Sequence, residues 1–224
     1  MKYVFCIFGE EKEETYKEQK MWLHTEGNKS RRVFPIQEMI DQTVFCVQTL
    51  RLFDKNTMVE IYTNKPELEC FKQFNQFSNI KIINFKEFYE KRKKDKLWCY
   101  RLRFDVYKQL DDDFVSLECD MFFKAPPKFE LTDNKYYTIT LLNTGIMGLT
   151  KKTKDKIIDE IIEKFDDRIK NYTLRCLDQD IFWETWKKYN FEVIETKNFL
   201  HHYYGNKVFY KTVSLEKIKK DNGL

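Results

Sequence analysis

Pairs of cysteines spaced as Cys-x-x-Cys are absent from this 224-residue sequence, although six cysteines are scattered along it. Neither a zinc site of that kind nor a disulfide framework is indicated, and we expect reduced thiols. No stretch approaches the length of a membrane span. The apolar run near the N-terminus is too short for a signal peptide and is followed at once by acids. These absences predict a cytoplasmic protein with no membrane span.

Internal repeats, linkers and low-complexity blocks are also lacking. We therefore predict a single domain over residues 1–224, with a C-terminal tail from about residue 208. A chain of this length can bury about 70% of the surface that its unfolded form exposes, so a sizeable core is available. Aromatic residues at 17% and charged residues at 34% are typical of a folded, soluble chain.

Positive charge is only modestly in excess. The net charge of +4 falls short of the strongly basic balance of a dedicated nucleic-acid-binding domain, so we expect no nucleic-acid partner. Lysine and arginine are nevertheless crowded between Lys86 and Lys108. A solvated basic helix face is the simpler interpretation of the run from Lys91 to Lys94, and a surface that attracts phosphates is the alternative.

The apolar pattern of the first 85 residues predicts strands that alternate with helices. A charged segment over residues 10–32 has no clear period and is interpreted as a loop. Strands separated by helices indicate an α/β domain, with a mainly parallel central sheet flanked by helices. The predicted elements are strands at 3–8, 59–63 and 80–85 and helices at 36–53 and 68–77.

Residues 114–123 form an apolar run of strand length that carries two acids two positions apart. Because side chains on a strand alternate between its faces, Glu118 and Asp120 are predicted to point the same way. Two carboxylates on one face repel each other and are costly to bury, which favours a cation between them. Their hard oxygen atoms suit magnesium or manganese better than zinc. Solvated acids at a strand end are the alternative interpretation.

The helix predicted over residues 97–110 carries two arginines in different positions. At about 100° per residue, Arg101 lies on the polar face with Asp105, whereas Arg103 falls on the apolar side. Arg103 therefore either extends from the edge of the core to solvent or turns into a cleft to meet an anion. Both interpretations stay open.

Glycines stand close to the end of another predicted strand, at 136–142. The segment from Asn143 to Gly148 is therefore predicted to form a tight turn or to let a ligand approach the backbone. Helical periodicity follows over residues 157–169 and again from Asp178. A last strand is predicted at 191–194.

Five short motifs follow one another in a particular order: Arg-Leu on a helix, acid-x-Asp on an apolar strand, Asn-x-Gly, Asp-Gln-Asp, and His-x-x-Gly with a lysine. This order, from Tyr3 to Lys207, resembles the metal-dependent glycosyltransferases of the Rossmann-like GT-A fold. It is most similar to glycosyltransferase family 8, which includes glycogenin and bacterial lipopolysaccharide galactosyltransferases. The order and spacing of all five motifs carry the resemblance, since acid-x-Asp alone is common.

The resemblance implies a metal site. Glu118 and Asp120 match the family's Asp-x-Asp, which holds Mn²⁺ against the donor diphosphate, with Glu in place of the first Asp. Mg²⁺ is the alternative ion. His202 matches the third metal ligand, with His201 as the other candidate. Gly205 and Lys207 match the glycine and the phosphate-binding lysine that follow, although the lysine comes one residue early and the family's Pro-Trp is missing.

Three further positions match residues that bind the donor in this family, and a fourth is a rival for one of these roles. Arg101 matches the basic residue that lies on the donor sugar and phosphates, and Arg103 is the rival for that role because of its helical phase. Asn143 and Gly145 match the Asn-Ala-Gly segment beside the sugars, with threonine in place of alanine.

Asp178, Gln179 and Asp180 match the Asp-Gln-Asp that faces the reacting sugar. The resemblance thus implies an enzyme that transfers a sugar from a nucleotide-diphosphate sugar, with UDP as the expected nucleotide, to a hydroxyl of a glycan or another acceptor. Family 8 enzymes retain the anomeric configuration. An inverting relative would need a carboxylate base, for which Asp178 or Asp180 would be the candidates.

Two other functions stay open, and nucleic-acid binding through the region from Lys91 to Lys94 ranks behind them. A sugar-phosphate nucleotidyltransferase shares a similar α/β architecture, but it normally carries a glycine-rich basic loop after the first strand, where this chain is acidic. A non-catalytic module that binds nucleotide sugars would show metal and nucleotide binding without turnover. Taken singly, Asp178 could also cap its helix, and His202 could be an ordinary histidine at the edge of the core.

Overall fold

The computed structural model describes most of the chain. The residues that it describes are 1–9, 14–16, 31–33, 36–93, 95, 98–139, 145–171, 177–202 and 211–224. Among the helices of these residues, none is both long enough and apolar enough to cross a membrane.

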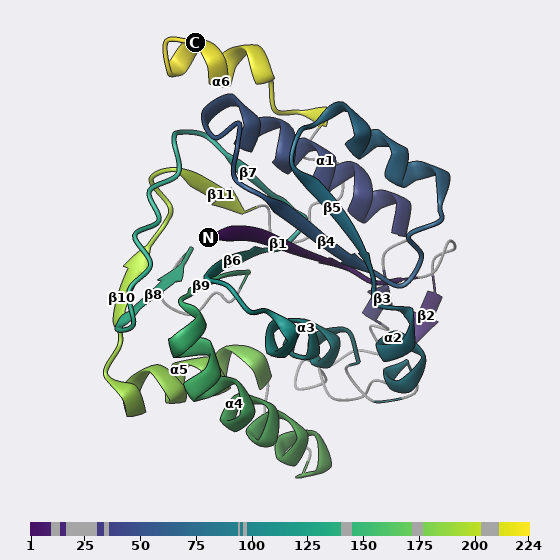
Figure 1. The fold of residues 1–224 in the computed structure, drawn as a ribbon, viewed down its shortest axis with the longest axis vertical. Helices are drawn as coiled ribbons and strands as arrows, with labels where there is room; N and C mark the ends of the chain where they lie inside the picture. Colours follow the sequence, from purple (N-terminus) through teal and green to yellow (C-terminus); the bar gives the residue numbers. More distant parts are fainter. Residues whose placement is uncertain are drawn as a thin grey trace.

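A five-stranded sheet lies at the centre of the molecule, in the order β5-β4-β1-β6-β9 (Figure 1). The pairs β1–β4, β4–β5 and β1–β6 are parallel, and β9 runs antiparallel to β6. The predicted α/β class with a mainly parallel sheet is therefore confirmed. The strands are Lys2–Ile7 (β1), Val59–Thr63 (β4), Ile80–Asn84 (β5), Phe114–Leu117 (β6) and Ile146–Leu149 (β9).

Both faces of this sheet are covered, because the central strand β1 is apolar on both sides. Tyr3, Phe5 and Ile7 are buried in the core beneath α1 and the 3-10 helix η2. Val4 and Phe8 are buried on the opposite face, beneath α3, α4 and α5 (Figure 1). The helices are Ile36–Phe53 (α1), Glu69–Gln76 (η2), Lys86–Arg92 (α2), Trp98–Gln109 (α3), Lys151–Asn171 (α4) and Leu177–Tyr189 (α5).

Smaller elements pack around this centre. Strands β8 (Lys135–Thr138) and β10 (Glu192–Glu195) form a parallel pair, and β7 (Met121–Phe123) and β11 (Leu200–His202) form an antiparallel pair. Within the C-terminal segment that was predicted to be a tail, helix α6 (Leu215–Asp221) packs on α1. Ile218 of α6 joins Phe45 and Phe122 in a small apolar cluster.

The predicted loop over residues 10–32 needs one correction. Strands β2 (Glu14–Tyr16) and β3 (Arg31–Val33) form an antiparallel pair, and β2 lies wholly within that segment. The sequence pattern missed this pair because backbone hydrogen bonds between strands do not require apolar and polar side chains to alternate.

Two further predictions of local structure are wrong. Residues 114–123 are not one strand, because β6 ends at Leu117, Cys119 and Asp120 form a turn, and β7 then joins a different sheet. Within the segment 143–148, predicted to form a tight turn or to let a ligand approach, residues 146–148 belong to strand β9 instead of a turn, and residues 143–144 lie outside the described part of the chain. A Cβ at Gly148 would lie 2.9 Å from Cδ2 of Tyr137. The glycine is thus required by close packing within the strand.

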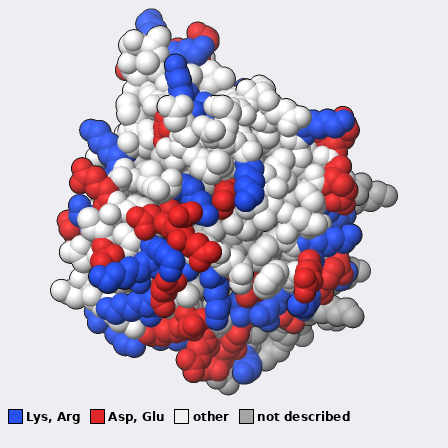
Figure 2. All heavy atoms as spheres, in the orientation of Figure 1, with Lys and Arg blue, Asp and Glu red and all other residues white. Residues whose placement is uncertain are grey.

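Charged side chains of both signs are intermingled on the face of the molecule that includes α4 and α5 (Figure 2). The basic segment between Lys86 and Lys108 is also compensated locally. Lys91 pairs with Glu87 at 2.6 Å, and Lys108 pairs with Asp159 at 2.6 Å. These two exposed lysines therefore have their own counter-charges.

Candidate metal and donor site

The candidate site lies at the carboxyl edge of the sheet. Because β1, β4, β5 and β6 are parallel, their carboxyl ends meet at one edge. Strands β4 and β5 lie on one side of β1 in the sheet, and the next strand along the chain, β6, lies on the other side of β1. The strand order therefore reverses at β1. Ligands of open α/β sheets bind in the crevice beside such a change.

The end of β1 is fixed by a buried amide that the sequence analysis missed. The backbone N–H of Gly9 donates to Oδ1 of Asn64 at 3.1 Å, and Nδ2 of Asn64 donates back to the carbonyl of Gly9 at 3.0 Å. Asn64 is 2% exposed. It therefore ties β1 to β4 at the carboxyl edge of the sheet. In the sequence, the only sign of this contact is that an asparagine directly follows a predicted strand.

Glu118 and Asp120 follow directly on β6. The backbone N–H of Glu118 donates to the carbonyl of Gly145 at 2.9 Å, so the Asn-x-Gly segment ends beside the acid-x-Asp motif. Asp120 lies in the turn before β7 and is buried, whereas the side chain of Glu118 is 35% exposed. The chain turns between the two acids, and this turn brings both carboxylates to the same side.

His202 completes the cluster through strand pairing. Antiparallel pairing of β11 with β7 places His202 opposite Met121, next to Asp120. Nε2 of His202 lies 3.0 Å from Oδ1 of Asp120 and 3.2 Å from Oε2 of Glu118. One ligand atom from each of these three residues lies within 4.8 Å of the other two, which is close enough for all of them to hold one metal ion. His201 is exposed and packs against the Phe122 ring, at 5.3 Å between ring centroids.

The two acids change the protonation of the histidine. Burial disfavours the charged imidazole, but the hydrogen bonds and negative charges of Asp120 and Glu118 outweigh it and raise the pKa of His202 to about 9. Burial also opposes ionisation of Glu118, yet His202 and Arg103 hold the pKa of this carboxyl below its ordinary value. The Glu118 carboxyl is thus ionised at neutral pH.

The two rival arginines have different environments. Nη1 of Arg103 lies 3.1 Å from Oε1 of Glu118, so this arginine turns from the apolar side of α3 into the candidate site. Arg101 instead bonds Asp105 on its own helix at 2.5 Å and Asp166 on α4 at 3.0 Å, and it is 6% exposed. Arg101 therefore links two helices, whereas Arg103 reaches the acidic cluster.

The other predicted site residues are only partly described. Gln179 and Asp180 are half-buried in the first turn of α5. Among the described residues, no hydrogen bond or ion pair joins either of them to Glu118, Asp120 or His202. The side chain of Asp178 lies outside the described part of the chain, as do the residues Asn143, Gly205 and Lys207.

Comparison with known proteins finds no matching family model and no curated protein of significant sequence similarity. The fold matches solved glycosyltransferase structures. Mouse xyloside xylosyltransferase 1 in its apo form has a TM-score of 0.55 and 9% identity, over 86% of this chain and 84% of that chain. The glycosyltransferase GlyE of Streptococcus pneumoniae has a TM-score of 0.53 and 12% identity, over 87% of this chain and 45% of GlyE, so this chain spans less than half of GlyE. The chain therefore has the GT-A fold of glycosyltransferases.

Proposed function

We propose that the chain is a metal-dependent glycosyltransferase that moves a sugar from a UDP-linked donor to a hydroxyl of a glycan or another acceptor. One observation supports this proposal above all. Glu118, Asp120 and His202 converge at the carboxyl edge of a glycosyltransferase-type sheet, beside the buried Arg103. Converging carboxylates and a cation at this edge suit a metal ion and a diphosphate.

The donor set fits a divalent ion. Two carboxylates supply hard oxygen atoms, and one imidazole nitrogen adds a ligand that Mn²⁺ accepts; Mg²⁺ is the alternative. Since only neutral imidazole ligates metals, His202 would release its proton when the ion binds. A divalent ion at this place would supply positive charge against the negative charge that develops on the departing diphosphate.

The residues of the chain itself would hold and orient the donor. In the proposal, Arg103 binds the diphosphate from the side of α3, and Lys207 binds it from the segment after β11. Both cations would stabilise the charge of the leaving group. Gln179 and Asp180, together with Asp178, would face the reacting sugar from the start of α5. Positioning of donor and acceptor in this way can contribute several orders of magnitude in rate. Retention of the anomeric configuration is part of the proposal.

Thermal unfolding with nucleotides tests the proposal directly. UDP, GDP and a panel of nucleotide sugars are compared with and without Mn²⁺, because a ligand that binds only the folded chain raises its stability. We expect a metal-dependent shift with uridine nucleotides. The shift identifies the donors to be used in turnover assays. No shift with any nucleotide would contradict the proposal.

Turnover of the donor then distinguishes an enzyme from a binding module. Asp120→Asn should abolish metal-dependent release of UDP from the sugar donor. Asp159→Asn is the matched control, because Asp159 lies on α4 and its side chain is 70% exposed. Nucleotide binding without any turnover by the wild-type chain would support a non-catalytic module instead. A fully active Asp120→Asn variant would contradict the site assignment.

A further inference from the structure

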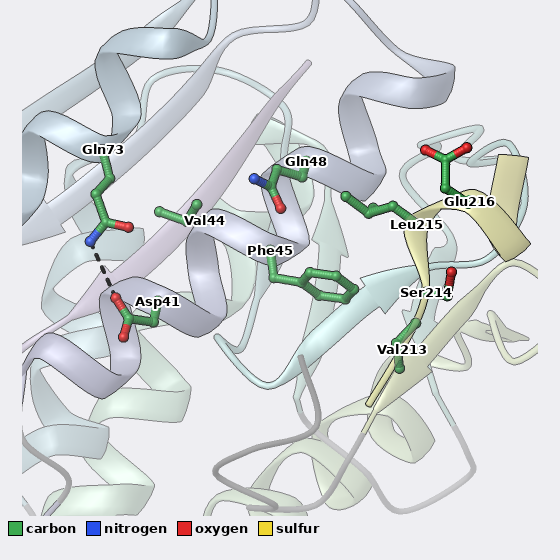
Figure 3. Close-up of a pocket in the computed structure, with 9 residues that line it drawn as sticks. All are labelled: Asp41, Val44, Phe45, Gln48, Gln73, Val213, Ser214, Leu215 and Glu216. Carbon is green, nitrogen blue, oxygen red and sulfur yellow. Dashed lines mark hydrogen bonds between the residues drawn. The ribbon is translucent and has the colours of Figure 1, made fainter. Parts of the chain in front are cut away.

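A second concave site lies between α1, η2 and the segment before α6 (Figure 3). The cleft has a volume of about 490 Å³, which is within the usual range for small-molecule sites. Its nine lining residues include none of the acidic cluster. The cleft is therefore a separate site on the α1 side of the sheet.

Apolar side chains line part of the cleft. Val44 and Phe45 of α1 are 7% and 6% exposed, and Val213 and Leu215 approach from the chain segment on the opposite side (Figure 3). Phe45 also packs on Phe122, with 6.0 Å between ring centroids. The cleft thus has a firm apolar floor that is anchored to β7.

Polar groups surround this floor. Nε2 of Gln73 donates to Oδ1 of Asp41 at 3.2 Å, and Nε2 of Gln37 donates to the same oxygen at 2.6 Å, so this carboxylate is held in place. The amide of Gln48 lies above Phe45, on the side of Val44 (Figure 3). This amide offers both a donor and an acceptor to a ligand.

The charge of the lining excludes some ligands. None of the nine lining residues is Lys, Arg or His, whereas Asp41 and Glu216 are acids, and Glu216 pairs with Lys219 at 2.7 Å. Phosphates, nucleotides and acidic glycans would meet the negative charge of Asp41, which no cation of the lining offsets. A neutral polyhydroxyl ligand suits the site, since its hydroxyls donate to carboxylates and pair with amides while the C–H faces of its rings lie on apolar side chains.

We propose that this cleft binds a neutral oligosaccharide, as a docking site for the glycan on which the chain acts. This inference rests on the proposed function for the identity of that glycan. Contacts between aromatic rings show that few residues separate the cleft from the acidic cluster. Phe45 of the cleft touches Phe122, and Phe122 touches His201, next to His202 of the acidic cluster. A glycan held at the cleft would raise the local concentration of acceptor ends near the reaction site.

A glycan array tests this proposal with the full chain. The array carries neutral, sialylated and sulfated oligosaccharides of three to six sugars, and UDP with Mn²⁺ is present to fill the nucleotide site. We expect retention on neutral glycans that nucleotide does not displace. The dissociation constant of the best neutral glycan is then measured by calorimetry for each variant.

Gln48→Leu removes the amide at nearly constant size, and we expect binding to weaken about tenfold, which corresponds to the loss of one or two hydrogen bonds. Gln48→Trp fills the cleft and should abolish binding. Gln76→Leu is the matched control, because Gln76 lies on η2, is exposed and does not line the cleft. Thermal unfolding of each variant verifies that it is folded.

Three results would overturn the inference: no retention on neutral glycans, retention only on acidic ones, or equal affinity in folded Gln48→Leu, Gln48→Trp and wild-type chains. The proposed function is judged separately by donor turnover and by Asp120→Asn. Glycan binding that persists in a chain without turnover would contradict only the proposed function.

Discussion

Replacement of the two arginines of α3 should have opposite consequences, although they are two positions apart. Arg101 is 6% exposed and joins Asp105 of α3 to Asp166 of α4. Arg103 contacts Glu118 in the candidate site. We therefore expect Arg101→Met to lower stability with little effect on nucleotide binding by the folded chain, and Arg103→Met to do the reverse.

The structure sets the size of each effect. Removal of one partner of a buried ion pair costs about 3–5 kcal/mol. Arg92 still pairs with Asp105 at 3.1 Å in the Arg101→Met variant, and the Asp166 side chain is 40% exposed. We therefore expect a loss of about 2–3 kcal/mol, which lowers the melting temperature by roughly 4–12 °C for a chain of this size.

Arg103→Met should reduce stability less. Glu118 is 35% exposed and keeps its contact with His202, so the expected loss is about 1 kcal/mol. In the proposed function, however, the variant loses a charge-assisted hydrogen bond to the donor diphosphate. Such a bond contributes about 1.5–3 kcal/mol, so the affinity for nucleotide should fall at least about tenfold.

Urea unfolding gives the free energy of unfolding of each variant. Calorimetry with UDP and Mn²⁺, at a temperature at which each variant is folded, gives the nucleotide affinity. Arg101→Lys keeps the charge and serves as the conservative control for Arg101→Met. Normal stability with lost nucleotide binding in Arg101→Met would refute the assignment of Arg101 to the α3–α4 contact. Unchanged nucleotide affinity in Arg103→Met would refute the role of Arg103.

Three further predictions concern the framework of the site. Gly148→Ala should lower the unfolding free energy by about 1–3 kcal/mol, because its Cβ would lie 2.9 Å from Tyr137; equal urea midpoints would contradict this packing. Asn64→Asp loses the N–H group that donates to the Gly9 carbonyl, and it should lower the free energy of unfolding in urea by about 1–3 kcal/mol. Wild-type stability of this variant would argue against that contact. Burial opposes ionisation of Glu160, but its hydrogen bonds to two lysines and a tyrosine lower its pKa from 4.5 to about 2. This stabilisation is present above pH 4.5 and is lost as the pH falls towards 2, so Glu160→Gln should cost about 1–2 kcal/mol at pH 7. The difference from the wild-type chain should narrow in acid, and a constant difference in urea unfolding across this pH range would contradict the assignment.

Much of the architecture follows from local sequence. An apolar run with no polar face marks β1 as a strand buried on both sides, and helical periodicity after Pro35 marks α1. These patterns predict the elements because burial of one or both faces selects apolar residues at the period of the element. The order of the five motifs also predicts the GT-A fold, although sequence identity to the solved structures is only 9% to 12%.

The sequence also predicted that Glu118 and Asp120 point the same way, but from alternation along a single strand, whereas in the structure a turn at Cys119 and Asp120 brings the two carboxylates together. It did not determine the break between β6 and β7, because a continuous apolar run does not reveal where a chain leaves one sheet for another. Only the tertiary structure decided that His202 rather than His201 faces the acids, through the register of β11 against β7. It likewise decided that Arg103 meets Glu118 while Arg101 meets Asp166. Partners 15 and 65 positions away are chosen by how α3 packs against its neighbours, and helical phase alone contains no information about them.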